Sequence, residues 1–82
     1  MARIGIEYCV ECMFLGRALE IAKVLLEQYP HKLESLEIVP GASGVFTVTL
    51  DGAPVFRIGT EGKLPAPEEI QRRLESKLRM HT

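Results

Sequence analysis

The stretch "IEYCVECMFL", residues 6–15, joins two different hydrophobic patterns across a pair of cysteines. Apolar residues alternate with glycine or charged residues from Ile4 to Tyr8, which predicts a short strand with one apolar face. Between positions 13 and 29 apolar residues recur at helical spacing, which predicts a helix with a wide apolar stripe. Cys9 and Cys12, the only cysteines in the chain, therefore lie at a strand–helix junction.

The segments that follow predict a mixed sheet. Residues 33–39 form a second predicted strand, which a right-handed crossover through the helix would place parallel to the first. Residues 45–50 and 55–58 predict a β-hairpin, because Asp51-Gly52 between them suits a two-residue type I′ turn. Pro54 cannot donate to a strand ladder, so the last strand should lie at an edge of the sheet.

The C-terminal part predicts a loop over residues 59–67 and then a second helix. Pro67 favours the first turn of that helix, where its missing N–H costs nothing. The predicted fold is one two-layer α/β domain spanning residues 1–82, in the order β-α-β-β-β-α. Its four-stranded mixed sheet would carry both helices on one face.

The predicted hairpin divides its side chains between the two faces of the sheet. A regular two-residue turn would place on the core face Phe46, Val48, Leu50, Ala53 and Val55. Phe56 and Ile58 would then lie on the open face, away from the helices. Exposed apolar side chains there would predict a docking surface for a protein partner or for a second copy of the chain.

Composition narrows the class of protein. The chain has 82 residues, of which 46% are hydrophobic and 26% charged, as expected for one small folded domain. Ten basic and 11 acidic residues give a net charge of -1, which argues against nucleic-acid binding. No apolar run approaches the roughly 20 residues of a membrane span, and the first residues lack a signal-peptide core. We expect a cytoplasmic protein without membrane or nucleic-acid partners.

The spacing of the cysteines suits thiol chemistry. In the first turn of a helix, one thiol would be stabilised as a thiolate by the helix N-terminus, and the other could close a disulfide after the first attacks a substrate. Glu11, inside the pair, opposes a further negative charge, and Arg17 would offset it by reaching back. Met13 is expected to fill the core.

Two other interpretations of the pair stay open. Structural zinc needs four ligands, whereas the pair supplies two, and His31 and His81 lack the spacing of a zinc-binding histidine pair. Alternatively, the cysteines could be small buried hydrophobes. In a reducing cytosol the redox interpretation is favoured over both, and no metal or cofactor is expected.

Four segments in consistent order resemble the selenoprotein W-like family, also called the SelT/SelW/SelH or Rdx family. They are "IEYCVEC", a helix ending in "EQYP", "LEIVPGASGVFTVTLDGAPVF" and "EGKLPAPEEI". The resemblance implies a thioredoxin-like fold and a role in cell redox homeostasis, linked to glutathione or protein thiols. The family's selenocysteine position falls on Cys12, which implies that Cys12 attacks and Cys9 resolves in this cysteine-containing CxxC form.

The predicted function is that of a thiol–disulfide redox protein, whose enzymatic form would be a thiol–disulfide oxidoreductase. The alternative is a redox-regulated protein–protein interaction module that uses the open sheet face. The predicted catalytic residues are Cys9 and Cys12. The predicted substrate-binding or partner surface comprises Val10, Glu11, Ser43, Gly44, Phe56 and Ile58.

Overall fold

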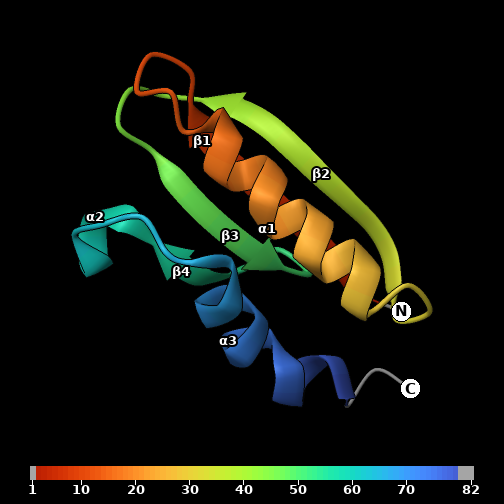
Figure 1. Cartoon of the computed structure of the whole chain (residues 1–82). Helices are drawn as coiled ribbons and strands as arrows, with labels where there is room; N and C mark the ends of the chain where they lie inside the picture. The colour runs from red at the N-terminus through yellow and green to blue at the C-terminus, as the bar shows by residue number, and fades with distance from the viewer. Residues whose placement is uncertain (1, 80–82) are drawn as a thin grey trace.

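The computed structural model describes residues 2–79 (Figure 1). Its elements are β1 (Ala2–Cys9), α1 (Leu15–Gln28), β2 (Leu33–Gly41), β3 (Phe46–Leu50), β4 (Ala53–Arg57), α2 (Ile58–Glu61) and α3 (Pro67–Arg79). In this part of the chain one four-stranded sheet has the order β2-β1-β3-β4. β1 is parallel to β2, and the other neighbours are antiparallel. The predicted mixed sheet and order of elements are confirmed, with α2 as an additional short helix.

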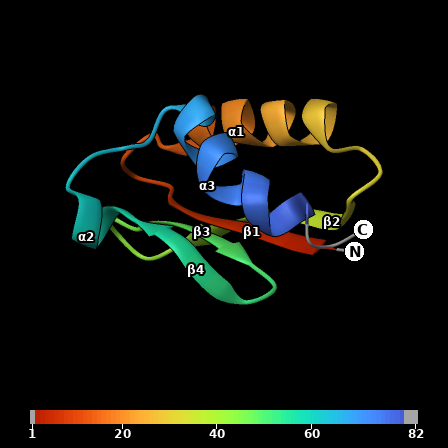
Figure 2. The same cartoon turned by 90° about the horizontal axis from the view of Figure 1, so that it is seen from below.

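The two long helices, α1 and α3, cover the same face of the sheet (Figure 2). Alternate side chains of β1 and β3 point toward them, because successive residues of a strand face opposite sides. The buried core between the layers includes Ile4, Ile6, Ile21, Leu25, Phe46, Val48, Ile70, Leu74 and Leu78. No helix within residues 2–79 is long and apolar enough to cross a lipid bilayer.

Helix α1 buries a narrower stripe than its sequence predicts. Its buried side chains are Ala18, Ile21, Ala22 and Leu25. Three leucines of the second apolar series are instead exposed: Leu15, Leu19 and Leu26. A helix on a sheet buries the stripe that faces the core, roughly 100° wide, so this second series lies outside that stripe. Apolar surface is therefore left in solvent along α1.

The turn between β3 and β4 has the predicted geometry. Asp51 and Gly52 have φ values of 52° and 87°, the left-handed backbone that a type I′ turn requires at both positions. β4, which contains Pro54, pairs only with β3 and is an edge strand, as predicted. Asp51 also accepts a hydrogen bond from the backbone N–H of Arg3 over 2.9 Å, so the turn is tied to β1.

A β-bulge reverses the predicted faces of β4. Val48 pairs with Phe56, whereas Thr49 pairs with Pro54, so Val55 is one extra residue between two regular pairs. The extra residue turns Phe56 to the core, where it is only 3% exposed. The prediction that Phe56 lies on the open face is therefore wrong. Pro54 has no N–H for the ladder, and a bulge beside it accommodates that missing donor.

Helix α2 replaces the end of the predicted strand and the start of the predicted loop. Ile58 is the first residue of α2 rather than the last of β4, and it is half-buried against the core. Gly62 ends the helix with a φ of 86°, and its N–H donates to the Ile58 carbonyl over 2.7 Å. A glycine in this left-handed conformation is a common helix stop. Ile58 therefore does not belong to an open sheet surface.

Candidate active site

The two cysteines lie where β1 runs into the loop before α1 (Figure 1). Cys9 is the last residue of β1, pairs in register with Gly41 of β2 and is completely buried. Cys12 lies in the loop and is exposed. Their Cα atoms are 5.4 Å apart, and a disulfide joins them. The pair therefore has one sulfur on a shielded residue and one on a residue that solvent reaches.

A tight turn sets the positions of the two sulfurs. The N–H of Met13 donates to the carbonyl of Val10 over 3.3 Å, which closes a turn with Cys12 inside it. The N–H of Cys12 donates to Sγ of Cys9 over 3.2 Å. Met13 has a φ of 58°, a left-handed conformation that is uncommon for a residue with a side chain. The loop is thus a defined turn rather than an extended connection.

The prediction that the cysteines lie in the first turn of a helix is wrong. Helix α1 begins at Leu15, and its N-cap residue, Phe14, makes no side-chain cap. Residues 10–14 offer no Ser, Thr, Asp or Asn that would cap an earlier start. The dipole effect of a helix falls off within its first turn, so Cys12, which precedes α1, is outside its strongest range. The donor that contacts a sulfur is instead the backbone N–H of Cys12.

Aromatic side chains anchor the end of this loop to the core. The ring of Phe14 meets that of Phe46 edge-on, with centroids 5.9 Å apart. Phe46 in turn meets Phe56 at 6.3 Å, and the guanidinium of Arg73 lies over the Phe56 ring at 5.2 Å. Such edge-to-face contacts add roughly 0.5–1.5 kcal/mol to the burial of the rings. Sequence reasoning missed Phe14 as a support of the site, although its position two residues after Cys12 was a usable signal.

The charges around the pair differ from the prediction in one respect. Glu11 is exposed in the loop between the cysteines. Arg17 does not reach back to it, because its guanidinium donates to the Pro65 carbonyl over 2.6 Å and to Glu20 over 2.9 Å. Among the ion pairs of residues 2–79, none involves Glu11. The carboxylate of Glu11 is therefore the charge directly beside Cys12 in sequence, and Arg17 does not pair with it.

The structure brings four of the predicted partner residues to the end of the sheet that carries the cysteines. Val10 and Glu11 lie in the β1–α1 loop and are exposed. Ser43 and Gly44 are exposed in the β2–β3 connection. This connection follows the residue that pairs with Cys9, so both loops emerge at one end of the sheet (Figure 1). Whether these residues bind a partner stays a prediction.

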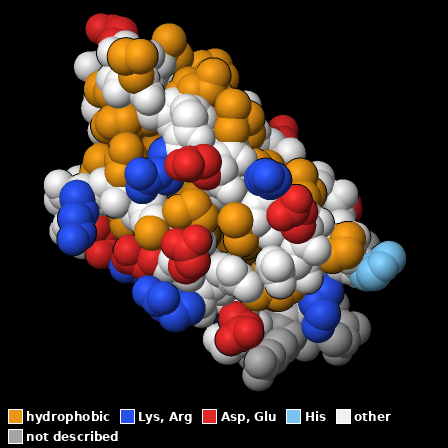
Figure 3. All heavy atoms as spheres, in the orientation of Figure 1, with side chains coloured by type: hydrophobic (Ala, Val, Ile, Leu, Met, Phe, Trp, Pro, Cys, Tyr) orange, Lys and Arg blue, Asp and Glu red, His pale blue; other side chains and the backbone are white. Residues whose placement is uncertain are grey.

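Met13 is not a core residue, contrary to the prediction. Its side chain is 87% exposed, and that of Val10, on the other side of Cys12, is 58% exposed. Leu15, at the start of α1, is also exposed. Figure 3 shows apolar side chains gathered at the end of the molecule where β1 runs into α1. Exposed apolar side chains therefore lie close to Cys12 in sequence on both sides, with Glu11 between Val10 and Cys12.

Histidines do not complete a metal site in the described part of the chain. Residues 2–79 contain no group of three or more His, Cys, Asp and Glu side chains arranged to hold a metal ion. His31 is exposed in the connection between α1 and β2, at the opposite end of β2 from Gly41. His81 lies outside the described residues. Both cysteines are joined to each other in the disulfide.

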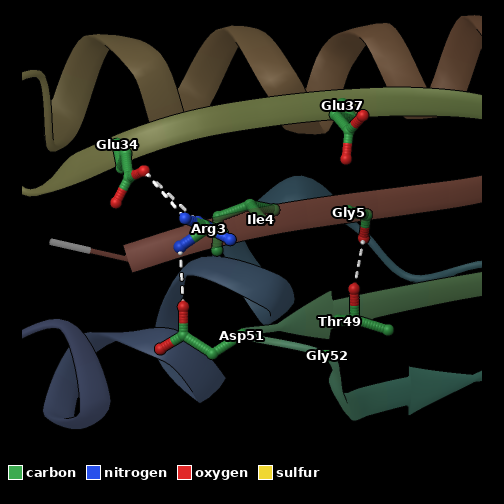
Figure 4. A pocket seen from close by; sticks show the side chains of 8 residues that line it. All are labelled: Arg3, Ile4, Gly5, Glu34, Glu37, Thr49, Asp51 and Gly52. Atoms are coloured by element: carbon green, nitrogen blue, oxygen red, sulfur yellow. Dashed lines mark hydrogen bonds and ion pairs between the residues drawn. The ribbon is translucent and has the colours of Figure 1, made fainter.

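A hollow on the sheet has none of the cysteine-loop residues in its lining (Figure 4). It measures about 640 Å³ and is lined by Arg3, Ile4, Gly5, Glu34, Glu37, Thr49, Asp51 and Gly52. Arg3 donates to Glu34 through two guanidinium nitrogens, at 3.1 and 3.3 Å. Charges of opposite sign thus meet within the hollow. No residue of the cysteine loop lines it, so it is not part of the candidate site.

Comparison with known proteins agrees with this fold. The sequence pattern described as the Rdx family matches residues 3–76. A crystal structure of a Bordetella parapertussis protein is 33% identical, with a TM-score of 0.88 over 93% of this chain and 96% of that one. A selenoprotein W-related protein from Vibrio cholerae is 23% identical, with a TM-score of 0.89 over 94% and 96% of the two chains. The latter likeness concerns the fold.

A bovine relative is longer than this chain. The Bos taurus protein named Migration and invasion enhancer 1 is 34% identical over 68 residues, which cover 83% of this chain and 57% of the relative. The matched region thus spans little more than half of that protein.

The thioredoxin-like fold and the disulfide at the end of β1 define a small protein with a CxxC motif of the kind used in thiol redox chemistry. The chain belongs to the Rdx family.

Proposed function

We propose that the protein exchanges disulfides with a thiol partner, with Cys12 as the attacking sulfur and Cys9 as the resolving sulfur. The observation that carries this proposal is the difference in burial across one disulfide: Cys12 is exposed, whereas Cys9 is completely buried. Thiol–disulfide exchange depends on access to the sulfur as well as on its ionisation. A substrate can approach Cys12 but not Cys9.

The reaction has two steps. The thiolate of Cys12 attacks one sulfur of a substrate disulfide, which forms a mixed disulfide and releases the other substrate sulfur as a thiolate. The thiolate of Cys9 then attacks Sγ of Cys12, which closes the Cys9–Cys12 disulfide and releases the second substrate thiolate. The substrate disulfide gains two electrons, and the protein dithiol loses two. The reverse sequence oxidises a substrate dithiol.

The turn favours the second step. The N–H of Cys12 points at Sγ of Cys9 in the disulfide. A donor in this position stabilises negative charge on sulfur, since hydrogen bonds to a charged acceptor are stronger than neutral ones. The Cα separation of 5.4 Å lies within the usual range for a disulfide, so Cys9 reaches Cys12 without rearrangement of the backbone. Cys9 is therefore suited to resolve a mixed disulfide although it cannot start one.

Glutathione and protein thiols are the partners that we propose, in a cytoplasmic setting where such thiols are kept reduced. The alternative function, a protein–protein interaction module, relied on Phe56 at an open sheet face. Phe56 is buried beneath the helices and cannot dock a partner. The exposed side chains beside Cys12 provide another surface for contacts, and it adjoins the reactive sulfur.

A redox titration tests the proposal. The protein is equilibrated over a series of reduced-to-oxidised glutathione ratios, thiols are blocked by alkylation, and mass spectrometry locates any bridge. We expect one reversible two-electron transition between the dithiol and a Cys9–Cys12 disulfide. The proposal is wrong if the pair neither bridges nor forms a glutathione adduct at any ratio in the series.

A further inference from the structure

The surface around Cys12 narrows the kind of molecule that can form a mixed disulfide there. Met13 directly follows Cys12 and Val10 lies two residues before it, and their side chains are 87% and 58% exposed. Leu15 adds exposed apolar surface at the start of α1. Figure 3 shows apolar side chains gathered at this end of the molecule, and contiguous exposed apolar surface often marks a site of contact with a partner. We call Val10, Met13 and Leu15 the apolar rim.

The backbone of the loop keeps the side chains of Val10 and Met13 exposed to solvent. Met13 has a left-handed φ of 58°, and the hydrogen bond from its N–H to Val10 closes the turn beneath the two side chains. A left-handed conformation costs a residue with a side chain roughly 1–2 kcal/mol, and glycine or asparagine would adopt it more readily. An apolar side chain at this strained position is exposed directly beside the reactive residue. Packing in the core does not account for it.

The disulfide that Cys12 forms indicates which kind of molecule contacts the apolar rim. Any partner that is joined to Cys12 by a disulfide must place the atoms on either side of its own sulfur against the neighbours of Cys12. Those neighbours are apolar except for Glu11, whose carboxylate Arg17 does not neutralise. Glutathione is small, polar and carries a net negative charge, so it gains little from the rim and is repelled by Glu11.

We infer that the preferred partner of Cys12 is a cysteine of another protein, flanked by apolar residues, rather than glutathione. This inference rests on the proposed exchange at Cys12 and adds its substrate class. In the step concerned, the Cys12 thiolate attacks the sulfur of the partner cysteine in a disulfide. The new bond joins Cys12 to the partner, and the other half of that disulfide leaves as a thiolate. The apolar flanks of the partner cover the rim, which removes apolar surface from water.

A competition between matched disulfides tests this inference. The Cys9→Ser variant leaves Cys12 as the only thiol, and it is offered two short peptides whose cysteine carries the same leaving thiol. One peptide has leucine on both sides of its cysteine, the other serine, and oxidised glutathione is the third substrate. We expect the leucine peptide to react about tenfold faster than the serine peptide, because the rim contacts its flanks, and oxidised glutathione to react most slowly.

Rim variants identify the surface responsible. Val10→Thr keeps the shape of that side chain, and Met13→Asn suits the left-handed backbone, so the pair removes apolar surface while keeping the turn. In this double variant the preference for leucine should fall to about twofold or less. Leu26→Gln is the matched control: Leu26 is 50% exposed on the same helix, about 16 Å further along its axis than Leu15, and the preference should persist. Comparing the two peptides within one variant cancels any change in the ionisation of Cys12.

Equal rates for the two peptides, or a leucine preference that survives the rim double variant, would overturn the inference. Faster reaction of oxidised glutathione than of both peptide disulfides would overturn it as well. These results would leave exchange at Cys12 intact. If none of the three disulfides forms an adduct with Cys12, the proposed function itself fails.

Discussion

The backbone N–H of Cys12 donates to Sγ of Cys9 over 3.2 Å, although the two residues differ sharply in exposure. The contact places a donor on the sulfur of the buried residue, while the other cysteine faces solvent. A shielded, hydrogen-bonded Cys9 and an accessible Cys12 divide the work of disulfide exchange between resolution and attack. This division depends on a turn and on the core beneath it, both of which can be probed separately.

Phe56 should be a principal core residue rather than a docking residue. Phe56→Ala removes a ring that is 3% exposed and contacts Phe46, so it should lower the free energy of unfolding by about 3–5 kcal/mol. Urea denaturation followed by circular dichroism measures the loss. Leu26→Ala, at an exposed position of α1, should change it by less than about 1 kcal/mol. Equal effects of the two substitutions would contradict the assigned burial.

The bulge that buries Phe56 explains why its position could not be predicted from the sequence. Alternation assigns faces correctly as far as Asp51-Gly52, where the turn chemistry is plain. Beyond the turn, one inserted residue, Val55, shifts every later side chain to the other face. Pro54 indicates an edge strand, but it does not specify a bulge. The parallel pairing of the first two strands, the edge position of β4 and the helix start at Pro67 follow from patterns that no local insertion disturbs.

The sequence identifies the two cysteines of the site, but it does not predict the turn that holds them. The spacing of Cys9 and Cys12 after a strand predicts their proximity. The start of α1 was placed too early because an apolar run continues through the loop, and no polar capping residue marks its end. Helical spacing likewise predicted a core position for Met13, whereas the turn holds that side chain outside. Apolar residues that lie at the surface of a fold look like core residues in its sequence.

Glu61 should make stability depend on pH in the acidic range. Arg73 donates to both of its carboxylate oxygens at 3.0 Å, and this hydrogen bonding lowers the pKa of Glu61 below its ordinary value of 4.5. A lowered pKa in the folded state contributes stability above the unfolded pKa and loses it as the pH falls through the folded pKa. Urea unfolding should therefore show Glu61→Gln as less stable than the parent near pH 7. At pH 3 the difference should be smaller than at pH 7, because protonation of Glu61 in the parent progressively removes the charge that Arg73 binds.

The control for this experiment is Glu34→Gln. Glu34 pairs with Arg3 on the more exposed open side of the sheet, where an ion pair contributes little. A Glu61→Gln deficit that is equally large at both pH values would indicate a packing role rather than an electrostatic one.

Met13 should be a conformationally costly position. Met13 has a left-handed φ of 58°. The Met13→Gly substitution relieves the strain of this conformation, whereas Met13→Ile increases it by placing a branched Cβ there. The glycine variant should be more stable than the isoleucine variant by about 1–2 kcal/mol. Thermal unfolding of the oxidised proteins measures this difference. Val10→Gly is the matched control, and it should be destabilising because Val10 is not among the residues with positive φ. A stable isoleucine variant would show that the turn is not formed as described.

The most direct test of the central claim is the reaction rate of each single-cysteine variant with dithiodipyridine, a small neutral disulfide whose released thiopyridone is followed by absorbance. In the Cys9→Ser variant the remaining thiol is the exposed Cys12, and it should react rapidly and form a stable adduct in the folded protein. In the Cys12→Ser variant the remaining thiol is the buried Cys9, which should react at least about tenfold more slowly until urea unfolds the chain. Equal rates in the folded state, or faster reaction of Cys9, would contradict the assignment of Cys12 as the attacking sulfur.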